Sequence, residues 1–144
     1  MHIGIIGCGQ LARMLALAGW NMGLGFSFLA DKGESTRSVR GLGRITCRSP
    51  DHSAKQVYIA MGEPDVITVE REHVDIELLR ALQDYCPVYP DPEAVETCGN
   101  RTLEKQLLSR LQLPTSPFRV AHTSLQVADA AHSLGMPVVV KATM

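Results

Sequence analysis

HIGIIGCGQLA, residues 2–12, gives the clearest indication of the fold. Its first five residues are mostly apolar and lead into a glycine, which is typical of a buried strand in a parallel sheet. Its last six match GxGxxG/A, the turn that joins the first strand of a βαβ unit to its helix. Glycines let the backbone turn tightly, and the free N–H groups at the start of the helix bind anions. The stretch therefore predicts a strand, a turn and a helix, with an anion beside the helix start.

Strand-like and helix-like segments alternate after this stretch. The first helix continues through apolar residues at helical spacing, namely Leu11, Met14, Leu15, Leu17 and Ala18. Further strands are predicted at residues 25–29, 44–47, 66–69 and 88–89, with helices at residues 52–61 and 75–85. Strands separated by helices form βαβ units with a parallel sheet. We therefore expect a doubly wound, Rossmann-like α/β domain with helices on both faces of the sheet.

The pattern changes after Pro92. A helix predicted at residues 101–111 is ended by Pro114 and Pro117. The remaining predicted elements are a strand at residues 118–121, a helix at residues 124–134 and a strand at residues 137–141. These elements are too few to enclose a core. We therefore expect one domain over residues 1–97 and the start of a second over residues 98–144.

Composition and charge exclude several classes of protein. A content of 45% hydrophobic and 20% charged residues in 144 is ordinary for a globular protein, and a net charge of −1 indicates no attraction to nucleic acid or membranes. The four cysteines are scattered without CxxC spacing, and the five histidines show no metal-like spacing, so we expect neither disulfides nor a metal site. No apolar run suits a signal peptide or a membrane span. We expect a cytoplasmic protein.

The glycine turn leaves the identity of its anion open. A nicotinamide or flavin cofactor is one alternative, since Asp31 lies about 20 residues further on at a strand end, as a ribose-binding acid would. A substrate phosphate is a second alternative, and a tight turn without a ligand is a third. Asp31 adds little, because aspartate is common where a strand runs into a loop.

A longer set of motifs resembles one family. Residues 5–15, IIGCGQLARML, are similar to the opening of the N5-carboxyaminoimidazole ribonucleotide synthases, in which the turn commonly reads GGGQLGRM. Further blocks agree in order: VITVERE at 66–72, NRTLEKQLL at 100–108, LPTSPF at 113–118 and VVVK at 138–141. The QLxRM continuation is more specific than the glycines, and nicotinamide enzymes do not require it.

The resemblance implies an ATP-grasp carbon–nitrogen ligase of purine (IMP) biosynthesis. Such an enzyme uses ATP, magnesium and bicarbonate to carboxylate 5-aminoimidazole ribonucleotide, and the resemblance also implies a homodimer. Residues 1–97 would be its pre-ATP-grasp domain and residues 98–144 the start of its ATP-grasp domain. Four alternatives stay open: a formate-dependent glycinamide ribonucleotide transformylase, a biotin carboxylase, a nicotinamide-binding domain, and a non-catalytic remnant.

Arg101 and Lys141 are the ATP-binding residues that the resemblance implies. Lys141 ends an apolar segment, where a lysine has no packing role and its ammonium suits a phosphate. Arg101 stands at a helix start, where a cation is unfavourable unless an anion binds there, and its planar fork matches phosphate oxygens.

The substrate pocket is expected at the glycine turn. By resemblance Gly9, Gln10 and Leu11 form part of it, with the helix start near the substrate phosphate. Glu70 and Glu72 are expected to point to the same side of a strand, because alternate residues share a face, at the edge where open α/β sheets bind ligands. We expect these two carboxylates to bind the ribose hydroxyls or the substrate amine. No catalytic residue is assigned.

The chain departs from the family pattern at several positions. Cys8 and Ala12 replace glycines of the turn, and Asn100 replaces an aspartate. Arg71 and His73 stand where the family often has an aromatic residue and an asparagine. The glycine-rich loop and the magnesium-binding carboxylates that follow the lysine strand in the family are not among these 144 residues. We therefore expect the chain to have no ATP turnover of its own.

Overall fold

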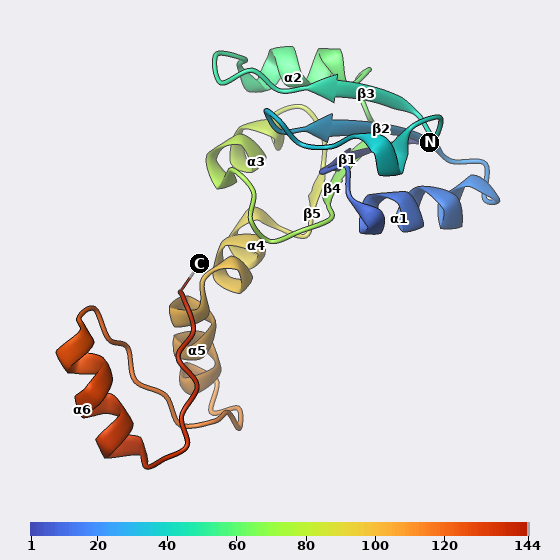
Figure 1. Ribbon diagram of the computed structural model, residues 1–144. Coiled ribbons are helices and arrows are strands. Elements are labelled where there is room, and N and C mark those ends of the chain that lie inside the picture. Colours follow the sequence, from blue (N-terminus) through green and yellow to red (C-terminus); the bar gives the residue numbers. More distant parts are fainter. Residues whose placement is uncertain (144) are drawn as a thin grey trace. The chain divides into compact units, whose positions relative to one another are not determined.

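The computed structural model describes residues 1–143 (Figure 1). Its elements are β1 (His2–Ile6), α1 (Gln10–Trp20), β2 (Gly25–Ala30), the 3-10 turn η1 (Arg37–Val39), β3 (Arg44–Cys47), α2 (Ala54–Ala60), β4 (Val66–Val69), α3 (Ile76–Leu82), β5 (Val88–Tyr89), α4 (Pro92–Gly99), α5 (Arg101–Arg110) and α6 (Ser124–Leu134). All strands and helices predicted before residue 90 are present, the later two helices being shorter than expected. Among residues 1–143, no helix has the length and apolarity needed to cross a membrane.

The five strands form one parallel sheet in the order β3-β2-β1-β4-β5. β1 lies at the centre, where Ile5 pairs with Phe28 of β2 on one side and with Thr68 of β4 on the other. The chain builds outward from β1 to β3 and then crosses back to add β4 and β5 on the other side. Open α/β sheets bind ligands at the carboxyl ends of the strands where the order reverses in this way. The predicted doubly wound parallel α/β fold is confirmed.

Each face of the sheet carries its own hydrophobic cluster. Helices α2 and α3 cover one face, where Leu29, Ile67 and Leu79 are buried. Helix α1 and η1 cover the other face, where Ile5 and Phe28 are buried. Because both faces are covered, the carboxyl edge of the sheet is the part of this fold suited to ligand binding.

Helix α1 packs on the sheet through small residues. Ala12, Ala16 and Gly19 are its buried positions, and a Cβ on Gly19 would lie 2.6 Å from the ring of Phe26. The large apolar side chains whose spacing predicts the helix lie on its other side, and Met14 is 63% exposed. Close approach of helix and strand therefore selects for small residues at the contact.

Helix α4 was not predicted from the sequence. It begins at Pro92, a residue suited to the first helical position because its missing N–H needs no partner there. Asp91 precedes it, and its Oδ1 accepts the N–H of Glu93 at 2.9 Å. The Asp-Pro pair is thus a helix-start signal that the prediction from the sequence did not use.

A second compact unit begins at Thr97, and two predictions made there are wrong. Residues 118–121 and 137–141 were predicted to be strands, but both segments are irregular. A strand needs a neighbour with which to exchange backbone hydrogen bonds, and residues 97–143 contain no such ladder. The apolar side chains of Val139 and Val140 are accordingly 80% and 69% exposed.

We predict that residues 1–100 fold as stably as the whole chain. Every buried hydrophobic residue lies at or before Val95, and no residue from 97 to 143 is buried. The free energies of unfolding should agree within about 0.5 kcal/mol, since the removed residues contribute no core. Urea unfolding followed by the fluorescence of Trp20, the only tryptophan, measures both. A clearly lower midpoint for residues 1–100 would show that the second unit stabilises the first.

Candidate functional site

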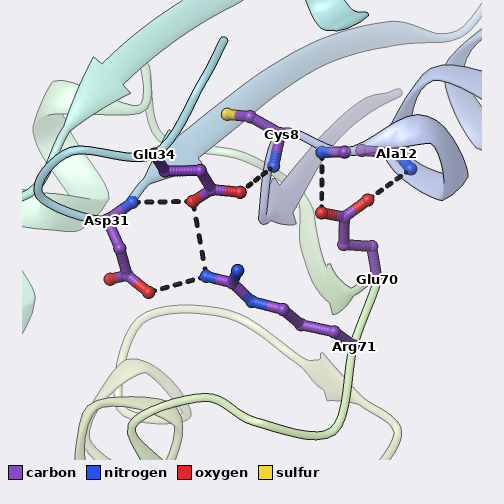
Figure 2. A network of polar contacts seen from close by, with 7 residues as sticks. Cys8, Ala12, Asp31, Glu34, Glu70 and Arg71 are labelled. Atoms are coloured by element: carbon purple, nitrogen blue, oxygen red, sulfur yellow. Dashed lines mark hydrogen bonds and ion pairs between the residues drawn. The ribbon is translucent and has the colours of Figure 1, made fainter.

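The carboxylate of Glu70 occupies the start of α1 (Figure 2). Glu70 comes directly after β4 and accepts the N–H of Gly9 through Oε1 at 2.7 Å and the N–H of Ala12 through Oε2 at 2.7 Å. Gly9 is the N-cap residue and has no side chain to supply such a bond. A glutamate 61 residues away in sequence therefore caps the helix. It takes the position that the GxGxxG/A pattern predicts for the anion of a ligand.

The glycines of the turn leave room for this glutamate. Gly7 has a φ of +114°, and a Cβ there would lie 2.4 Å from Cγ of Glu70. A Cβ on Gly9 would lie 2.8 Å from Oε1 of the same side chain. Both distances are shorter than real Cβ contacts, so a side chain at either position would displace Glu70. In this structure the glycines therefore leave room for the carboxylate of Glu70.

A second carboxylate, that of Glu34, joins the carboxyl ends of three strands (Figure 2). Its Oε1 accepts the N–H of Cys8, after β1, at 2.8 Å, and its Oε2 accepts the N–H of Asp31, after β2, at 2.9 Å. Arg71, after β4, donates from Nη2 to Oδ2 of Asp31 at 2.7 Å and to Oε2 of Glu34 at 3.3 Å. The side chain of Glu34 is 14% exposed, against 49% for Asp31. Glu34 is thus the sheltered centre of this network.

The structure brings most of the predicted substrate residues to one edge of the sheet. Gly9, Gln10 and Leu11 lie in the turn and first helical residues, beside the carboxylate of Glu70. Gln10 and Leu11 are exposed, and their N–H groups meet no acceptor within the described chain. Glu72 is also exposed and makes no side-chain hydrogen bond to residues 1–143. These groups are available to a ligand, whereas Glu70 is engaged.

One expectation about the two glutamates is wrong. Glu70 and Glu72 were expected to share a face of a strand, but β4 ends at Val69 and both lie beyond it. The N–H of Glu70 still donates to the carbonyl of Ile6 at 3.2 Å, but the regular strand has ended. Strand alternation therefore does not describe their orientation.

Glu34 and Arg71 are absent from the residues predicted to form the site. Arg71 is visible in the sequence only as a departure from the family pattern, and Glu34 lies in a loop without a motif. Their contact joins residues 37 apart, and the contact of Glu34 with Cys8 joins residues 26 apart. No local sequence pattern encodes pairs at such separations.

The two predicted ATP-binding residues lie in the second unit. The N–H of Arg101, the first residue of α5, donates to the carbonyl of Thr143 at 2.9 Å, and Thr143 follows Lys141 by two residues. Both cationic side chains are exposed. Asn100 caps α5 with Oδ1 accepting the N–H of Thr102 at 2.9 Å, as the usual aspartate would. The backbone contact thus brings together two segments that are distant in sequence.

The described residues do not fit a magnesium site. Within residues 1–143, no group of three or more His, Cys, Asp or Glu side chains is arranged to hold a metal ion. The sheltered carboxylates of Glu34 and Glu70 accept N–H groups instead. No chemistry of this chain is therefore assigned to magnesium.

Cys8 lies within the network as a neutral thiol. Burial, together with the nearby carboxylates of Glu34 and Glu70, raises the pKa of Cys8 to about 12. Burial also raises the pKa of Cys86, whereas Cys47 and Cys98 are exposed. Because the thiolate is the reactive form of cysteine, Cys8 is unsuited to nucleophilic catalysis.

We predict that iodoacetamide at mildly alkaline pH modifies Cys47 and Cys98 and spares Cys8 and Cys86. A thiol with a raised pKa stays protonated, and a buried one is also out of reach of the reagent. Peptide mass spectrometry of the native chain measures the modified fraction at each position. Alkylation in urea is the control and should modify all four. Rapid native modification of Cys8 would mean that the network opens readily.

The fold and the site define a Rossmann-like α/β domain whose glycine turn holds one of the protein's own glutamates. Residues 1–98 match the family model described as the ribonucleotide synthetase preATP-grasp domain. The chain belongs to this family.

Several similar proteins are N5-carboxyaminoimidazole ribonucleotide synthases or synthetases. The N5-carboxyaminoimidazole ribonucleotide synthase of Pseudomonas aeruginosa is 33% identical over 141 residues, covering 98% of this chain and 38% of that protein. The corresponding synthetase of Thermus thermophilus has a TM-score of 0.78 at 32% identity, covering 94% of this chain and 37% of that one. The Aspergillus clavatus synthase in complex with ADP and 5-aminoimidazole ribonucleotide has a TM-score of 0.76 at 25% identity, covering 94% and 36%. The chain is thus similar to the amino-terminal portion of these relatives and spans less than two fifths of their length.

Proposed function

We propose that this chain is the ribonucleotide-binding part of an ATP-dependent carbon–nitrogen ligase of purine biosynthesis. The complete enzyme would carboxylate 5-aminoimidazole ribonucleotide with bicarbonate to the N5-carboxy product, converting ATP to ADP and phosphate. The observation that carries the proposal is the position of Glu70 beside the glycine turn, where the strand order of the sheet reverses, with the exposed Glu72 two residues further along the chain. The names of the relatives support this ligase over the formate-dependent transformylase and biotin carboxylase. We assign residues 1–97 to the pre-ATP-grasp domain and residues 98–144 to the start of the ATP-grasp domain.

The charge of the edge determines which end of the ribonucleotide it can face. The three carboxylates of Asp31, Glu34 and Glu70 and the guanidinium of Arg71 give it a formal charge of −2 (Figure 2), and the exposed carboxylate of Glu72 directly follows Arg71 in sequence. A phosphate would meet the carboxylate that already occupies the helix start, and like charges repel. Ribose hydroxyls and an amine are donors, which carboxylates accept. We therefore assign the ribose and the amine to this edge, in place of the expectation that the phosphate lies at the helix start.

The nicotinamide alternative requires a vacant helix start and an available Asp31. Glu70 occupies the first, and Asp31 is paired with Arg71 at 2.7 Å. A dinucleotide would have to displace both contacts before its pyrophosphate and ribose were bound. This geometry favours the ribonucleotide over a nicotinamide cofactor.

Arg101 and Lys141 are the ATP contacts that we propose. Both carry exposed cations on segments joined by the hydrogen bond from Arg101 to Thr143, and cations of this kind suit phosphates. We assign no magnesium ligand and no catalytic residue among residues 1–143.

Ligand-induced stabilisation tests this proposal. A ligand present at about 100 times its dissociation constant adds about 2.7 kcal/mol to the free energy of unfolding. We expect 5-aminoimidazole ribonucleotide to raise the unfolding midpoint and NADH to leave it unchanged. Glu72→Gln should weaken the effect of the ribonucleotide without altering the midpoint of the unliganded chain, since its carboxylate has no protein partner among residues 1–143. Stabilisation by NADH and not by the ribonucleotide would contradict the proposal.

Three further parts of the proposal await measurement. Phosphate release from ATP by the 144-residue chain is expected to stay at background, and a coupled phosphate assay measures it. The homodimer implied by the resemblance is tested by sedimentation equilibrium. The cytoplasmic location is supported by four free cysteines, which suit a reducing compartment, and fractionation of cells tests it.

A further inference from the structure

Among the residues at the carboxyl edge of the sheet, Glu34 contacts the largest number of separate chain segments. It accepts the backbone N–H of Cys8 at 2.8 Å and of Asp31 at 2.9 Å, and it pairs with the guanidinium of Arg71 at 3.3 Å. These partners lie one or two residues beyond the ends of β1, β2 and β4. A carboxylate that is only 14% exposed is stable as an ion when hydrogen bonds replace its water, and here three donors do so.

The contacts of Glu34 lead to both parts of the proposed binding edge. Cys8 stands directly before Gly9, whose N–H binds Glu70. Arg71 stands between Glu70 and Glu72 in sequence, and its Nη2 is held by Glu34 and by Asp31. The contacts on the guanidinium therefore tether the segment that carries both glutamates. Glu34 contacts neither glutamate itself, so its influence on them passes through these two neighbours.

We propose that Glu34 is a positioning residue of the ribonucleotide site. It holds the glycine turn through the N–H of Cys8 and the segment of residues 70–72 through Arg71, so that Glu70 meets the helix start and Glu72 stays available. The inference rests on the proposed function for the identity of the ligand. The coupling between Glu34 and the turn is independent of that function, because it is measurable without a ligand.

The test compares Glu34→Gln with Glu96→Gln in the 144-residue chain. Glu96 is a matched control, because it accepts from Nη2 of Arg80 at 2.7 Å, away from the network. The readouts are the amide signals of Gly9 and Ala12 in ¹H–¹⁵N spectra and the dissociation constant of 5-aminoimidazole ribonucleotide by calorimetry. We expect Glu34→Gln to shift both amide signals, although their acceptor is Glu70, and to raise the dissociation constant at least tenfold. Glu96→Gln should change neither.

A purely structural role would give a different pattern. It would lower the urea midpoint and leave the binding constant of the folded fraction unchanged, and this outcome would overturn the proposal. Unshifted signals of Gly9 and Ala12 would overturn it as well. If Glu34→Gln fails to fold, Arg71→Gln tests the same link and should move the same two signals. A wild-type chain that does not bind the ribonucleotide would contradict the proposed function, while the amide signals would still decide the positioning role.

Discussion

Glu70→Ala is expected to lower the free energy of unfolding by about 3 kcal/mol, because it removes two hydrogen bonds to a charged acceptor. The N–H groups of Gly9 and Ala12 donate to its two oxygens at 2.7 Å each, and the N-cap residue offers no replacement. The start of α1 would also lose the negative charge that its dipole favours. Urea unfolding followed by the fluorescence of Trp20, which lies on α1, measures this loss.

Glu72→Ala is the matched control for this measurement. Glu72 is the same residue type two positions along the chain, but it is exposed and its side chain has no hydrogen-bond partner among the described residues. Its replacement should change the free energy of unfolding by less than about 0.5 kcal/mol. Glu70→Gln keeps one acceptor oxygen and should fall between the two. Equal midpoints for Glu70→Ala and Glu72→Ala would mean that the carboxylate does not cap the helix.

Gly7→Ala is expected to destabilise the chain by about 4 kcal/mol, from backbone strain and from overlap with a packed side chain. Gly7 has a φ of +114°, which L-residues rarely adopt, and its added Cβ would lie 2.4 Å from Cγ of Glu70. The new methyl group would drive the glutamate away from the helix start. Urea unfolding again gives the loss of free energy.

A double-mutant cycle separates the two causes. In the Glu70→Ala background the overlap is gone, so Gly7→Ala should destabilise by about 2 kcal/mol less than in the wild-type chain. Gly41→Ala is the control for strain alone, since Gly41 has a φ of +80° and no atom within 4 Å of an added Cβ. It should lower the free energy of unfolding by about 1 kcal/mol. Simple additivity of Gly7→Ala and Glu70→Ala would contradict the contact between these residues.

The parts of the candidate site that depend on local sequence pattern were predictable. The motif of residues 7–12 correctly predicts a turn, a helix start and an anion beside it. The run of apolar residues at β4 predicts a strand whose following glutamates reach the same edge. The identity of the anion was not predictable, because it is the side chain of Glu70, supplied from 61 residues away. Glu34 carries no local signal at all, since its role exists only through partners on three different segments.

The strands and α-helices of residues 1–90, their parallel α/β arrangement and the location of the proposed binding edge follow from the amino-acid sequence, because helical and strand periodicity and glycine turns act over a few neighbouring residues. Only the tertiary structure determines that the glycine turn holds the carboxylate of Glu70, and that Asp31 pairs with Arg71. The strand order places β1 between β2 and β4, so the residues that leave these three strands meet at one edge. The segments at residues 118–121 and 137–141 illustrate the same division. Their apolar pattern is that of strands, yet a strand forms only where a second one is present to share its hydrogen bonds.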